Sequence, residues 1–251
     1  MKTPQESIEE FHLIFLDQLS RNLDKALYAI KGGCNLRFFF HSIRYSEDLD
    51  IDVKTIATNT LKSKIDKILK GSVLKQILRT RKLEIEHVSS PKQTETTQRW
   101  KITLKTDLPL RLNTKIEFSR RKFHEGVQFD PVNAELIQKY HLGPILCAHY
   151  TPSVAIQQKF EALAGRAQTQ VRDLFDIYFL MMFQGILPEK KTISASLIEK
   201  AKLNAMTVTF GDYKSQVVAY LPPEYQPQYG TIDFWERMVD EILEKIELIK
   251  S

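Results

Sequence analysis

The spacing of apolar residues predicts a series of helices and strands in the first part of the chain. Between residues 5 and 23, apolar residues recur at helical spacing, which predicts an amphipathic helix with Ser7 as its N-cap. Residues 26–31 form a short apolar run typical of a buried strand, and a short helix is expected over 34–41. A second long helical pattern covers residues 58–79.

Three strand-like segments follow, at residues 82–88, 98–106 and 110–119. They are joined by a polar loop that contains Pro91 and by a tight turn, and such short connections favour antiparallel pairing. From about residue 130 the pattern is helical, with helices expected over 153–166, 171–184, 193–204, 208–220 and 231–249. We therefore expect two domains, residues 1–130 and 131–251.

One polar motif interrupts the apolar pattern between the first strand and the long helical segment. Gly32 and Gly33 follow the strand directly, and Asp48 and Asp50 lie further on, in a run of alternating apolar and acidic residues. In a strand this alternation places both aspartates on one face. Carboxylates crowded on one face repel each other unless a cation such as Mg²⁺ neutralises them.

The glycine pair predicts a site for the opposite kind of ligand. Backbone N–H groups at a glycine turn that begins a helix can bind phosphate. A phosphate-binding turn followed by paired aspartates therefore predicts a site for a nucleoside triphosphate. The alternative is a solvated edge strand after a glycine turn, and the order of the two features favours the nucleotide site.

Composition narrows the class of protein without deciding its function. The chain of 251 residues is 43% hydrophobic and 27% charged, which is ordinary for a globular protein. Its two cysteines, Cys34 and Cys147, form no disulfide framework, which indicates a reducing cytoplasm. No apolar run is long enough to span a membrane. The net charge of +5 is compatible with an RNA partner, and the lysine-rich 58–79 helix is either a solvated surface or an RNA-backbone surface.

The helical half contains a second group of charged residues, within QQKFEALAGRAQTQVRDLFDIYFL at residues 157–180. Lys159 lies on the apolar stripe of its predicted helix. A lysine there must either extend to solvent or pair with an anion, and a bound triphosphate is one such anion. Asp173 and Asp176 share one face of the next helix, and Arg166 and Arg172 are candidate ion-pair partners for Asp173.

These motifs resemble those of a known family. The glycine pair followed by Arg44-Tyr-Ser-Glu-Asp-Leu-Asp-Ile is similar to the core motif of the AbiEii nucleotidyltransferase toxins, which include the MenT-type enzymes. The second group resembles the lysine, arginine and Arg-Asp-Leu-aromatic-Asp motif of the same family. Together the motifs cover about residues 25–182. One departure is Cys34, where the family usually has threonine or serine after the glycines. A thiol is a weaker hydrogen-bond donor than a hydroxyl, so a contact from this side chain to phosphate would be weaker here.

The resemblance implies a fold and a set of roles. The expected fold is α+β, a polymerase-β-like nucleotidyltransferase domain with a small mixed sheet, followed by an α-helical domain, with the active site in the cleft between them. Catalytic roles are implied for Asp48, Asp50, Glu117, Lys159 and Asp173, with Asp48, Asp50 and Glu117 as metal ligands. Nucleotide-binding roles are implied for Gly32, Gly33, Ser46, Lys159 and Asp176. Taken alone, Glu117 is better explained as an exposed strand residue.

The resemblance also implies a biological role. It indicates a toxin of a type IV-like toxin–antitoxin system, with a cognate antitoxin and a part in phage defence. The enzyme would use Mg²⁺ or Mn²⁺ to transfer a nucleotide from an NTP to the 3′ end of tRNA, which blocks translation. Two alternatives remain open: transfer to a protein or small molecule, and a catalytically inactive relative that acts by binding.

Overall fold

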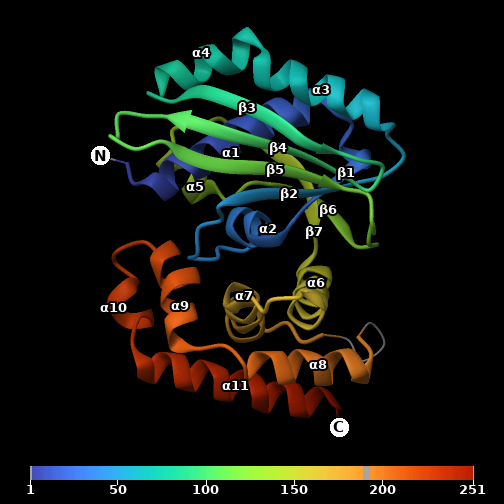
Figure 1. Ribbon diagram of the computed structural model, residues 1–251, viewed down its shortest axis with the longest axis vertical. Coiled ribbons are helices and arrows are strands. Elements are labelled where there is room, and N and C mark those ends of the chain that lie inside the picture. The colour runs from blue at the N-terminus through green and yellow to red at the C-terminus, as the bar shows by residue number, and fades with distance from the viewer. Residues whose placement is uncertain (1, 189–192, 251) are drawn as a thin grey trace. The chain divides into compact units, whose positions relative to one another are not determined.

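The computed structural model describes residues 2–188 and 193–250, and these fold into two compact units (Figure 1). The first unit comprises the chain up to His41 together with Tyr45–Tyr150, and the second comprises Ser42–Arg44 together with the chain from Thr151 onward. The boundary expected at residues 130 and 131 falls at the end of a strand of the first unit. Within the described residues, no helix is both long and apolar enough to cross a membrane.

The first unit is built on a mixed seven-stranded sheet in the order β3-β4-β5-β2-β1-β7-β6. Its elements are α1 (Pro4–Asn22), β1 (Tyr28–Lys31), α2 (Gly32–Phe39), β2 (Asp48–Val53), α3 (Thr58–Lys70), α4 (Ser72–Thr80), β3 (Glu84–Gln93), β4 (Thr97–Lys105), β5 (Leu112–Ser119), β6 (Val127–Pro131), α5 (Ala134–Lys139) and β7 (Leu146–Tyr150), with a short 3₁₀ turn at Lys25–Leu27. β3, β4 and β5 pair antiparallel, as predicted, whereas β2 pairs parallel with β5 and β1 parallel with β7.

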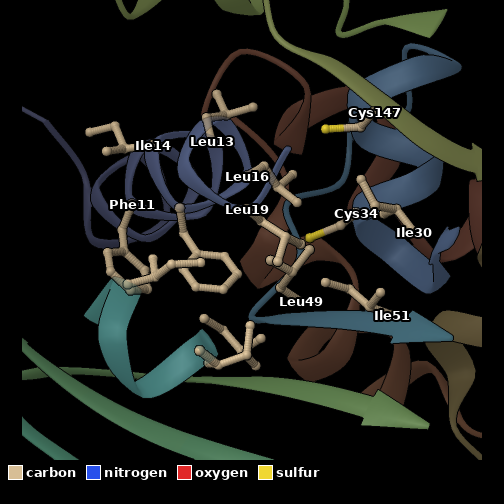
Figure 2. Packing of buried hydrophobic residues seen from close by; sticks show 14 of the residues in the cluster. Phe11, Leu13, Ile14, Leu16, Leu19, Ile30, Cys34, Leu49, Ile51 and Cys147 are labelled. Atoms are coloured by element: carbon tan, nitrogen blue, oxygen red, sulfur yellow. The ribbon is translucent and has the colours of Figure 1, made fainter. Parts of the chain in front are cut away.

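The core of this unit lies between α1 and one face of the sheet. Leu16 and Leu19 of α1 gather with Cys34 of α2 and with Leu49 and Ile51 of β2 (Figure 2). α3 and α4 pack against α1 and β3 and bury their leucine and isoleucine residues in the same core. Because side chains alternate along a strand, the residues between these positions project from the opposite face of the sheet.

Several local predictions differ from the structure. The N-cap of α1 is Thr3, which forms a capping box with Glu6, so the assignment of Ser7 was wrong by one helical turn. The helix expected over 58–79 is two helices that meet at Gly71, where an added Cβ would lie only 2.8 Å from the Lys67 carbonyl oxygen. β3 continues to Gln93 through Pro91, which an edge strand tolerates because no neighbour needs its N–H.

The second unit is helical in the residues described. It contains α6 (Pro152–Gly165), α7 (Val171–Met182), α8 (Ala195–Ala205), α9 (Phe210–Gln216), α10 (Gln226–Tyr229), α11 (Ile232–Lys250) and a 3₁₀ turn at Val218–Tyr220. α6 packs against α7 and α8, and α11 packs against α7 and α8. These elements agree closely with the helices expected from the apolar pattern.

Candidate functional site

The glycine turn lies directly beside the aspartate strand. Lys31 ends β1 and caps α2, and Gly32 begins the helix with a φ of +68°, a value that L-residues with a side chain rarely adopt. A Cβ at Gly32 would lie 3.4 Å from Asp50 Oδ2. Glycine is therefore required both for the backbone conformation and for the close approach to Asp50. The first N–H groups of a helix have no intrahelical acceptor, so Gly32 and Gly33 can offer theirs to an anion.

Four carboxylates share the face of the sheet opposite α1, and we call them the acidic face: Asp48, Asp50, Asp52 and Glu117. In β2 the aspartates alternate with Leu49, Ile51 and Val53, which are buried in the core. β5 runs parallel to β2 with Asp50 directly beside Glu117. The predicted placement of Asp48 and Asp50 on one face, with Glu117 on a neighbouring strand, therefore matches the strand register.

Basic residues are interleaved with the acidic face. Lys115 Nζ lies 2.6 Å from Asp48 Oδ2, and Arg99 Nε donates to Glu117 Oε2 at 2.6 Å. Lys31 Nζ lies 2.5 Å from Asp52 Oδ1, and the Tyr150 hydroxyl donates to Asp52 Oδ2 at 3.0 Å. Sequence reasoning did not single out these basic residues, and only Lys115 gave a local signal, because it alone shares a strand with one of the acids, two residues before Glu117.

Asp50 is the exception on this face. In the described part of the chain it forms no hydrogen bond or ion pair through its carboxylate, whereas the other three acids each have a basic partner. Burial raises the pKa of Asp50 above 3.8, and the negative charges of Asp48 and Glu117 raise it further. The positive charges of Lys115 and Lys31 lower this pKa but do not cancel the rise. A cation bound beside Asp50 would offset this unfavourable charge.

Ser46 and Cys34 both support the start of β2 by hydrogen bonds to its backbone. The Ser46 hydroxyl and the Cys34 thiol donate to the Asp48 carbonyl oxygen at 2.9 and 3.2 Å. Cys34 is fully buried in the core, and burial raises the pKa of its thiol. The thiol therefore contacts the backbone of β2 from the core, so its weak hydrogen bonding need not weaken a contact to phosphate.

The acidic face fits a divalent cation by the chemistry of its donors. Asp48, Asp50 and Glu117 supply carboxylate oxygens, the ligands preferred by Mg²⁺ and Mn²⁺. In residues 2–188 and 193–250, however, no three acidic, histidine or cysteine side chains stand close enough to form a metal centre as they are. Because Asp48 and Glu117 are held by Lys115 and Arg99, binding would require these pairs to rearrange.

The second unit holds the other predicted site residues in a buried ion-pair network. Lys159 Nζ lies 3.0 Å from Asp173 Oδ1 and 2.6 Å from Asp176 Oδ2, and its exposed fraction is 8%. Arg166 Nε donates to Asp173 Oδ2 at 2.7 Å. Burial works to raise the pKa of both aspartates, but the cations around them, Lys159 first for Asp173 and Arg44 first for Asp176, lower it. Lys159 thus pairs with protein carboxylates and does not extend to solvent.

Arg44 is the member of this network that sequence reasoning missed. It belongs to the Arg-Tyr-Ser motif, yet it packs in the second unit, where its guanidinium donates to both carboxylate oxygens of Asp176 at 2.8–3.1 Å. The spacing of the motif could not reveal this pairing, because Asp176 lies 132 residues further along the chain. Arg44 and Asp176 therefore join the two sequence motifs directly.

Solved structures show the same fold in other proteins. JHP933 from Helicobacter pylori is 18% identical, with a TM-score of 0.62 over 99% of this chain and 93% of that one. MenT4, a nucleotidyltransferase toxin from Mycobacterium tuberculosis H37Rv, is 16% identical, with a TM-score of 0.58 over 96% of this chain and 84% of that one. At these identities the likeness concerns the fold, and it confirms the predicted fold class.

A comparison with curated proteins finds no significant match. The family model of the nucleotidyl transferase AbiEii toxin of type IV toxin–antitoxin systems matches residues 14–245, well beyond the stretch covered by the sequence motifs. The chain therefore belongs to the AbiEii family of nucleotidyltransferase toxins.

Proposed function

We propose that this protein is the toxin of a toxin–antitoxin pair and transfers a nucleoside monophosphate from an NTP to the 3′ end of tRNA. The observation that carries this proposal is the register that sets Asp50 beside Glu117 and under the turn of Gly32, in a chain of this family. Family membership supports an antitoxin partner. The choice of tRNA as the acceptor rests on the resemblance to MenT-type enzymes.

In the proposed reaction, the acceptor hydroxyl oxygen bonds to the α-phosphorus of the NTP. The bond between that phosphorus and the bridging oxygen breaks, pyrophosphate leaves, and the hydroxyl proton passes to a carboxylate of the acidic face or to water. Gly32 and Gly33 would hold the departing phosphates by their N–H groups. Divalent cations held by Asp48, Asp50 and Glu117 would supply charge neutralisation at the phosphates and a more acidic acceptor hydroxyl.

Other predicted site residues would position the structure around this site without contacting the reacting atoms. Ser46 fixes the start of β2 through the Asp48 carbonyl, which is a positioning role. The catalytic and nucleotide-binding roles of Lys159, Asp173 and Asp176 stay predictions. Their contacts support a positioning role as well, because together they hold α6, α7 and Arg44 to one another.

The test is a labelling experiment with α-labelled NTPs, total RNA and Mg²⁺. We expect label in tRNA with the wild-type protein, and a loss of roughly a hundredfold or more in Asp48→Asn and Asp50→Asn. Asp50→Asn should remain folded without metal, because it removes a partly buried charge that has no partner. Strong destabilisation of this variant would mean that Asp50 is structural.

The other outcomes separate the alternatives. Label in protein or in small molecules, with the same dependence on Asp48 and Asp50, would move the acceptor to another class. Incorporation into no acceptor would favour an inactive relative that acts by binding.

A further inference from the structure

The strand register places basic side chains directly beside the carboxylates of the acidic face. In the ladder of β2 and β5, Asp48 pairs with Lys115 and Asp50 with Glu117. In the neighbouring ladders, Lys31 lies opposite Asp50 and Arg99 lies opposite Glu117. Since paired positions project from the same face, acids and bases lie side by side across four adjacent strands.

Lys115 is the base whose charge acts on two of the predicted metal ligands, Asp48 and Asp50. Its ammonium lies 2.6 Å from Asp48, and its charge also acts on Asp50, whose carboxylate has no partner of its own in the described chain. Lys31 is engaged by Asp52, which is not a predicted ligand. Arg99 holds Glu117 with two nitrogens of a planar guanidinium, whereas Lys115 uses one flexible ammonium that a rotation can release.

We propose that Lys115 is an internal counter-cation that neutralises Asp48 in the metal-free protein and competes with a divalent cation for that carboxylate. The inference rests on the proposed function, since it assumes that Asp48 is a metal ligand. The protein thus carries a partner for Asp48 before any metal binds, and metal binding must displace it. The free energy needed to break the ion pair between Lys115 and Asp48 raises the concentration of divalent cation at which the site is occupied.

Removing the charge of Lys115 should have two opposite effects, lower stability without metal and tighter metal binding. A purely structural role of Lys115 would not produce both. Replacing Lys115 by methionine keeps an unbranched stem of similar length but removes the charge. The metal-free protein should lose stability, because Asp48 loses its partner and faces Asp50 and Glu117 unshielded. The same variant should bind metal more tightly, because no ion pair has to be broken. The pair is partly exposed, so we expect roughly a fivefold gain in affinity.

The experiment measures both properties in the absence of nucleotide. Mn²⁺ binding is followed by calorimetric titration, and melting temperatures are recorded in chelator, for the wild type, Lys115→Met, Asp48→Asn and a control. The control is Lys101→Met, because Lys101 lies directly opposite Lys115 on the same face, is exposed, and has no ion pair in the described residues. Lys101→Met should leave affinity and melting temperature near those of the wild type.

Each result decides the matter. Tighter Mn²⁺ binding with a lower metal-free melting temperature in Lys115→Met supports the inference. Unchanged affinity, or weaker affinity as in Asp48→Asn, would overturn it while leaving the proposed function intact. The inference would also fail if the wild type bound no Mn²⁺, or if Asp48→Asn left its Mn²⁺ affinity unchanged. The labelling experiment would then show separately whether the proposed transfer fails as well.

Discussion

His12 is a titratable residue that is completely removed from water in the core around the glycine helix. Its Nε2 lies 2.8 Å from the Thr114 hydroxyl, which itself donates to the Glu47 carbonyl at 2.6 Å, so His12 must be the donor to Thr114. Nδ1 then carries no proton and faces the Cys34 sulfur at 3.8 Å. Burial lowers the pKa of His12 to about 3. The imidazole is therefore neutral in the folded protein at physiological pH.

This neutral histidine predicts a pH dependence of stability. Between the ordinary pKa of 6.5 and the folded value of about 3, the unfolded chain binds a proton that the folded chain does not, so stability falls as pH falls through this window. His12→Gln keeps a donor toward Thr114 and does not titrate. The difference in free energy of unfolding between wild type and variant should shift by up to about 1.4 kcal/mol per pH unit below 6.5. Chemical denaturation between pH 7 and pH 5 measures it, and a pH-independent difference would contradict this assignment.

At the residue scale, the sequence predicted the positions of the acids but not their partners. Alternation in 48–53 was sufficient to place Asp48 and Asp50 on one face, because the period of a strand is a local property. The partners Lys115 and Arg99 depend on strand register, which is set by distant segments. Cys34 shows the same limit: its position after the glycines suggested a phosphate contact, whereas its side chain turns into the core.

Elements with a strong periodic pattern were predicted well, and those held by distant contacts were not. The helices from α6 to α11 were found because their apolar stripes are continuous. β6 is exposed along its whole length and β7 is short, so neither shows an alternation strong enough to be recognised. β7 is in the sheet because it pairs with β1, more than a hundred residues earlier. The helical part was therefore expected to begin too early, at about residue 130.

The network between α6 and α7 gives a prediction that differs from the one based on sequence. A lysine on an apolar stripe could be expected to tolerate methionine without loss of stability. Since Lys159 bonds two buried carboxylates, Lys159→Met should instead lower the free energy of unfolding by about 2 kcal/mol, within the range for hydrogen bonds to charged groups. Arg166 and Arg44 remain as partners for Asp173 and Asp176, which limits the loss.

Denaturant unfolding at neutral pH measures this loss. Lys200→Met is the matched control, because Lys200 is exposed on α8 and has no partner within the described residues. Lys159→Arg should retain most of the stability, because it keeps the charge. Wild-type stability in Lys159→Met would show that the network contributes little, and a nucleotide role for Lys159 would then be the better explanation of its position.

At the scale of the first unit, the sheet separates two surfaces of opposite character. The acidic face projects from one side, whereas α3 and α4 pack on the other side, where Trp100 of β4 donates to Asp66 of α3. The exposed side of these helices carries a basic surface: Lys64, Lys67, Lys70, Lys75 and Arg79. Asp66 is the single acid in α3 and α4, and it already pairs with Lys62.

This separation restricts how an RNA could use the basic surface. A short oligonucleotide at the acidic face cannot also reach residues across the sheet, whereas a folded tRNA is large enough to extend around its edge. If the basic surface binds RNA, it should therefore contribute to full-length tRNA and not to a short acceptor with the same 3′ end.

The prediction is that Lys67→Glu combined with Lys75→Glu weakens binding of tRNA and lowers the slope of log affinity against log salt by about 2, one for each lost phosphate contact. Transfer to the short acceptor should be unchanged, which also shows that the variant is folded and active. The control is Lys200→Glu with Lys214→Glu, two exposed lysines of the second unit that give the same change in net charge. An equal loss in both double variants would indicate a general effect of net charge. Unchanged tRNA affinity and salt slope in the Lys67→Glu, Lys75→Glu variant would show that the basic surface of α3 and α4 is only solvated and does not bind RNA.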